Sequence, residues 1–78
     1  MGKHLSVEAL MSIIIDLADD LKVARELVYE APGLGVEYKI ACKMRDEVFE
    51  SRRKVLDEIN KKGGYEKYWY AAHVLCPI

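Results

Sequence analysis

Two long stretches of the chain have apolar residues at a helical spacing, and only a few residues separate them. In residues 6–30 the apolar positions alternate steps of four and three: Leu10, Ile14, Leu17, Leu21, Ala24 and Val28. This spacing is typical of the buried seam of an amphipathic helix. Residues 36–62 again carry apolar side chains at a helical spacing, and the intervening segment 31–35 contains Pro32 and two glycines, which favour a turn. So short a connection between two long helices predicts an antiparallel helical hairpin.

A third, shorter helix is expected at residues 65–76, after a Gly-Gly hinge at 63–64 and before Pro77. The fold class predicted for residues 1–78 is therefore all-α, a single helical domain. A helix of this length spans only ~18 Å, about half the length of the two long helices. If it folds back over the hairpin, it leaves the half nearest the turn uncovered.

This mismatch in length predicts an exposed apolar patch near the turn. Its expected members are Leu21, Val28, Tyr29, Leu34, Tyr38 and Ile40. A contiguous apolar patch usually marks an interface, and small chains commonly gain stability by association. We therefore expect a homodimer that forms a helical bundle, or a higher oligomer.

Composition and charge exclude several classes of protein. Twelve Lys and Arg against thirteen Asp and Glu give a net charge of −1, which excludes a strongly basic coat for duplex nucleic acid. The aliphatic run at residues 13–15 is stopped by Asp16 and, like every other apolar run in the sequence, is far too short for a membrane span or a signal peptide, so no membrane association is expected. Two cysteines are too few for a disulfide scaffold and indicate a reducing, cytoplasmic location. Residues 1–6 match the N-myristoylation template, and lipidation of Gly2 stays an open alternative.

The positions of three arginines are unusual. Arg25, Arg45 and Arg52 fall within the apolar faces of the two long helices, where an unpaired guanidinium is costly. One interpretation is internal pairing, of Arg45 with Asp20 and of Arg52 with Asp16. The other is an anion site for a nucleotide, a small anionic ligand or a nucleic-acid strand, since guanidinium groups and aromatic faces suit phosphate and base. The residues of this predicted site are Arg25, Arg45, Arg52, Lys22, Tyr29 and Tyr38.

The short helix begins with a cluster of aromatic residues. Tyr68, Trp69 and Tyr70 are consecutive, so they point in three directions and cannot all enter the core. We expect Trp69 to pack on the hairpin. Tyr68 or Tyr70 then stays more exposed and forms a contact site for a partner protein.

The sequence carries no catalytic signature. The residues considered as zinc ligands are His4, Cys42, His73 and Cys76. Only His73 and Cys76 have a useful spacing, one helical turn apart, and two ligands do not make a closed zinc site. We therefore expect no metal and no cofactor. The first functional hypothesis is a small non-enzymatic binding protein, a regulator or inhibitor that docks a helical surface on a partner protein. The alternative is ligand binding at the predicted anion site.

Overall fold

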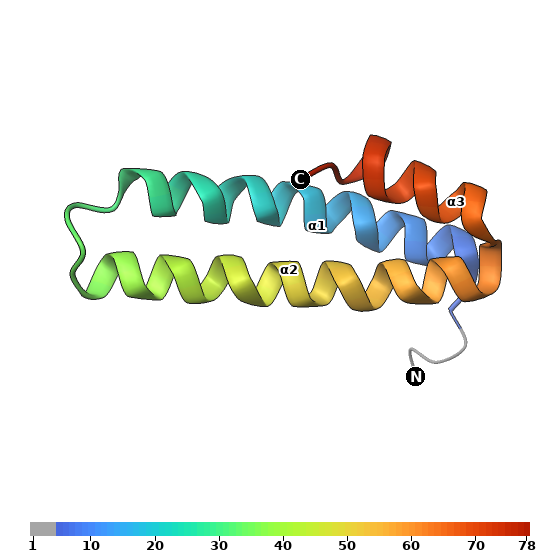
Figure 1. Ribbon diagram of the computed structural model, residues 1–78, viewed down its shortest axis with the longest axis horizontal. Coiled ribbons are helices and arrows are strands. Elements are labelled where there is room, and N and C mark those ends of the chain that lie inside the picture. Colours follow the sequence, from blue (N-terminus) through green and yellow to red (C-terminus); the bar gives the residue numbers. More distant parts are fainter. Residues whose placement is uncertain (1–4) are drawn as a thin grey trace.

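The computed structural model describes residues 5–78 and contains only helices and their connections within that range. Helix α1 (Val7–Glu30) and helix α2 (Val36–Gly63) run antiparallel, and helix α3 (Tyr65–Tyr70) lies against them near the end opposite the turn (Figure 1). The chain continues from α3 into a π-helical turn, η2 (Ala71–Leu75). The predicted all-α hairpin with a short C-terminal helix is confirmed.

The ends of α1 follow from local chemistry. The Ser6 hydroxyl accepts a hydrogen bond of 3.1 Å from the backbone N–H of Ala9, which caps the first turn. At the other end Ala31 is extended, as expected before proline, and its N–H closes the last turn on the carbonyl of Leu27. Gly33 follows with φ +62°, a conformation that glycine adopts without strain, and the chain reverses into α2.

The Gly63-Gly64 pair brings α3 back onto the hairpin. Gly64 has φ +87°, which any other residue would adopt only with strain. Gly63 lies so close to its neighbours that an added Cβ would stand 3.2 Å from Val7 and 3.0 Å from the Lys67 side chain. One glycine therefore permits the turn, and the other permits close packing of α2, α3 and the start of α1.

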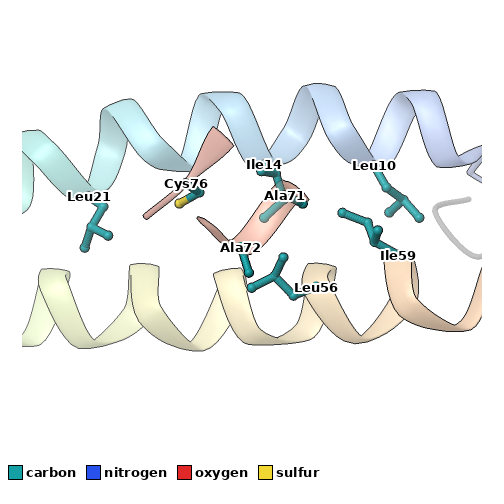
Figure 2. Packing of buried hydrophobic residues seen from close by; sticks show 8 residues of the cluster. All are labelled: Leu10, Ile14, Leu21, Leu56, Ile59, Ala71, Ala72 and Cys76. Carbon is teal, nitrogen blue, oxygen red and sulfur yellow. The ribbon is translucent and has the colours of Figure 1, made fainter. Parts of the chain in front are cut away.

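The core lies in the half of the molecule away from the turn. Side chains from α1, α2 and the C-terminal segment meet there, as Figure 2 shows. Its buried members are Leu10, Ile14, Leu21, Leu56, Ile59, Ala71, Ala72 and Cys76. The side chains that the C-terminal segment buries, Ala71, Ala72 and Cys76, are small, so this segment can approach both long helices closely.

The other half, which we call the turn half (residues 20–46), is only two helices thick. It buries Leu21, Ala24 and Ala41 and leaves most of its large apolar side chains in solvent. The exposed ones are Val23, Leu27, Tyr29, Leu34, Val36, Ile40 and Met44. The C-terminal segment ends near the middle of α1, so it reaches only the edge of this half and leaves most of it uncovered (Figure 1).

One member of the predicted exposed patch is misplaced. Leu21 is only 2% exposed, because it faces α2 and belongs to the core cluster with Cys76. The other five members are half-buried (Val28 and Tyr38) or exposed (Tyr29, Leu34 and Ile40).

No helix among residues 5–78 combines the length and apolar character that crossing a bilayer requires.

Candidate functional site

Arg52 holds the C-terminal segment in place. Its Nε donates a hydrogen bond of 3.0 Å to the carbonyl of Cys76, and one Nη donates another of 3.0 Å to the carbonyl of Ala72. The expected pairing with Asp16 was wrong. The carbonyls at the end of the C-terminal helix lack partners within their own helix, and the guanidinium satisfies two of them. Arg52 is thus engaged inside the molecule and less available to an external anion.

Arg45 also pairs differently from the expectation. Its guanidinium lies 3.4 Å from the carboxylate of Asp46, the next residue along α2, and not against Asp20. Arg45 stays half-exposed and acts on Tyr38, whose position two helical turns earlier brings the two side chains to the same flank of α2. The pKa of Tyr38 lies above its usual value, chiefly through a side-chain hydrogen bond with Cys42, and Arg45 opposes this rise.

Three of the predicted anion-site residues come together on α1. Lys22, Arg25 and Tyr29 line a groove of about 350 Å³ that also contacts Pro77, so the groove lies on the face that carries the C-terminal segment. Arg25 forms no hydrogen bond or ion pair with another residue of 5–78. Glu26 lines the same groove and reduces its positive charge. We call this the cationic groove.

A second depression crosses the other face of the turn half. It consists of two adjoining hollows that share Met44. Each residue of an α-helix is rotated by about 100° from the one before it. Val23 and Leu27 are one or two residues away from the lining residues of the cationic groove, so their side chains point about 100–200° away from that groove, toward the opposite face of α1. Ionisable residues at its edge are all acidic: Asp20, Glu30, Glu37 and Glu47. We call this depression the acid-rimmed groove.

Sequence reasoning missed most of the acid-rimmed groove. Val23 and Leu27 lie outside the four-and-three seam of α1, so the periodicity gave them no place in the predicted patch. Of the groove's floor only Ile40 belonged to the predicted patch. The signal was present in α1 itself, because two large apolar residues one turn apart on a polar face are unusual.

The aromatic residues of α3 are arranged differently from the expectation. Tyr68 packs against the core, whereas Trp69 is 48% exposed and Tyr70 is similarly exposed. Trp69 is therefore about half in solvent, and Tyr68 takes the place against the core that was expected for Trp69. The alanines and Cys76 take the buried positions, because the close approach of this segment leaves no room for an indole. Trp69 instead contacts His73, with ring centroids 5.0 Å apart.

Few residues of the described chain offer covalent or metal chemistry. Cys76 is fully buried and Cys42 half-buried, and both are free thiols. Among residues 5–78 no group of three or more His, Cys, Asp or Glu side chains is arranged to hold a metal ion. His4 and Gly2, the lipidation candidate, lie outside the described residues.

The geometry defines an all-α helical hairpin with two grooves on opposite faces of its turn half. Comparisons of the chain with protein-family models, with curated proteins and with solved structures gave no match.

Proposed function

We propose that the protein is a small non-enzymatic helical binding protein that acts as a regulator or inhibitor by docking its turn half on a partner protein. We place this activity in the cytoplasm, where the two free thiols stay reduced. In this proposal the core half stabilises the fold, and the turn half forms the binding surface.

One observation carries this proposal: the turn half exposes seven large apolar side chains, from Val23 to Met44, and buries only three residues. Ile40 is 54% exposed and Met44 is 42% exposed, although both lie beside the helix-helix contact. Four of the seven, Val23, Leu27, Ile40 and Met44, gather at the acid-rimmed groove, and apolar side chains that gather on one surface usually mark an interaction site. A second polypeptide that covers them would complete the core that α3 leaves unfinished.

The proposal is tested by photo-crosslinking in the protein's own host. A photoreactive amino acid replaces Ile40 in the turn half, and in a control it replaces the exposed Asp57 on the polar face of α2. The proposal expects a discrete crosslinked protein from position 40 and none from position 57. Equal, diffuse labelling from both positions would count against it.

We also propose that the chain forms a homodimer, in which the patch residues outside the acid-rimmed groove, Val28, Tyr29, Leu34 and Tyr38, meet a second copy. Tyr29 supports this proposal most, since its ring is 90% exposed beside the half-buried Val28 and Tyr38. Sedimentation at two protein concentrations tests it. The homodimer proposal expects twice the monomer mass at the higher concentration, and Tyr29→Glu should lower the proportion of dimer.

The cationic groove supports a second candidate function, the binding of a nucleotide or another small anion. Lys22 and Arg25 line this groove beside the ring of Tyr29, and its volume falls within the range of small-ligand pockets, about 300–1,000 Å³. A panel of nucleotides tests this candidate through thermal stabilisation. Arg25→Gln should abolish any stabilisation, whereas Arg53→Gln on the outer face should leave it unchanged.

A further inference from the structure

The acid-rimmed groove has an apolar floor that runs along the seam between α1 and α2. Val23 and Leu27 from α1 face Ile40 and Met44 from α2, and all four are exposed. The lining extends along α1 from Leu17 to Ala31, a distance of about 21 Å at the rise of an α-helix. A helix of about 14 residues, or four turns, has the same length.

The rim gives this groove a definite charge. Asp20 and Glu30 stand on α1, Glu37 and Glu47 stand on α2, and no Lys or Arg lines either hollow. None of the four carboxylates forms an ion pair or a hydrogen bond within residues 5–78, although Asp46, Glu50, Asp57 and Glu58 do. Four unpaired negative charges around an apolar floor favour a ligand that brings cations at its edges.

We propose that the acid-rimmed groove binds a basic amphipathic helix of a partner protein, about four turns long. This inference rests on the proposed function and names the partner's chemistry. Leu, Ile or Met side chains of the partner's apolar face contact Leu27, Ile40 and Met44, and its flanking Lys or Arg side chains pair with the rim. The flexible thioether of Met44 adapts to the shape of the entering side chains.

A second copy of this chain fits the groove less well. The exposed apolar residues of α3 and η2 are Tyr65, Trp69, Tyr70 and Val74, and their ionisable neighbours Glu66, Lys67 and His73 do not form two flanking basic rows. Helix α1 carries six acidic residues against two basic ones, Lys22 and Arg25, so its surface would on balance repel the rim. Charge therefore favours a different protein as the occupant.

Three synthetic helices of about 14 residues test this inference. All carry leucines at the same three- and four-residue spacing, and their flanking positions are lysine, glutamine or glutamate. Binding is measured by calorimetry with the full chain. The inference expects the lysine peptide to bind at least tenfold more tightly than the glutamine peptide and the glutamate peptide not to bind. Added salt should weaken the lysine peptide only.

Variants of the protein locate the site of binding. Met44→Lys should abolish binding of the lysine peptide, and its circular dichroism should stay unchanged because this side chain is partly in solvent. Glu30→Gln combined with Glu37→Gln should weaken binding about tenfold, since two rim charges are lost. Glu8→Gln combined with Glu66→Gln removes the same charge from exposed positions of the core half and should leave binding unchanged.

Three other results would overturn the inference, and each would show which part of it is wrong. Equal binding of the glutamine and lysine peptides, still lost in Met44→Lys, would refute the basic partner but leave the proposed binding function standing. A dimer that Met44→Lys dissociates would identify a second copy as the occupant. Failure of all three peptides to bind would refute a helix-binding groove, and the crosslinking experiment would then decide separately whether the turn half binds a protein at all.

Discussion

Arg52 is the residue on which the attachment of the C-terminal segment most depends. Its two hydrogen bonds to the carbonyls of Ala72 and Cys76 are charge-assisted and partly buried. Arg52→Met should lower the free energy of unfolding by about 2–3 kcal/mol, because it removes both bonds and leaves two carbonyls unsatisfied. Urea denaturation measures this change.

Arg53 provides the matched control for that experiment. It lies next to Arg52 in the sequence but points to solvent, where it contacts Glu50 at 2.6 Å and Asp57 at 3.6 Å. Arg53→Met should leave the free energy of unfolding nearly unchanged, because exposed ion pairs contribute little. If the two substitutions proved equally harmless, Arg52 would not hold the segment.

Glu50 gives the described chain one acid-sensitive contact with a known direction. Its pKa is lowered, first by the side-chain hydrogen bond from Arg53 and then by the charge of that residue. A lowered pKa in the folded state means that the stabilising contribution is present above the usual carboxyl pKa and is lost as the pH falls through the folded value. Glu50→Gln should therefore reduce, slightly, the fall in melting temperature between about pH 5 and pH 3. An unchanged acid profile would show that the contact does not form in solution.

At the scale of elements, the glycines of the second turn control how α3 returns to the hairpin. Gly64→Ala should cost about 1–2 kcal/mol, because alanine must take a positive φ there. Gly35→Ala is the control, since this glycine has ordinary extended φ and open space around its Cα. Because Gly35 is the N-cap of α2, where glycine is preferred over alanine, the substitution has a cost of its own, but it should cost less than Gly64→Ala because it forces no positive φ. Equal effects at both positions would mean that the α2–α3 turn tolerates another geometry.

The helices and turns could be predicted from the sequence because their causes are local. The four-and-three spacing, the Ser6 cap, Pro32 and the paired glycines each act within a few residues, and the two long helices lie within one residue of their expected ends. The contacts of Arg52 could not be predicted. Its partners are carbonyls 20 and 24 residues away, exposed by a helix end whose π-helical form leaves no periodic signal.

The candidate site was only partly predictable for the same reason. The sequence indicated an uncovered turn half, because that followed from the lengths of three helices. It did not separate the two faces of that half, since the angle between α1 and α2 decides which residues line each groove. Lys22, Arg25 and Tyr29 meet on one face, while the floor at Leu27 and Met44 became apparent only in three dimensions.

At the scale of the whole molecule, the structure is unevenly built. Its extents of 42 × 26 × 14 Å describe a flat rod, in which three helices share the core half and two helices form the turn half. The few buried apolar contacts of the turn half should make its backbone open more readily than that of the core half. A covering polypeptide would supply the missing contacts and slow this opening.

Hydrogen–deuterium exchange measures this difference most directly. In a dilute solution of the protein alone, amides of the turn half, residues 20–46, should exchange at least about tenfold faster than those of α1 residues 7–19 and of α2 residues 47–63. A bound partner, or the lysine peptide, should slow exchange in the turn half selectively. Equally slow exchange in both halves of a dilute monomer would contradict the account, because the turn half would then be stable without any cover.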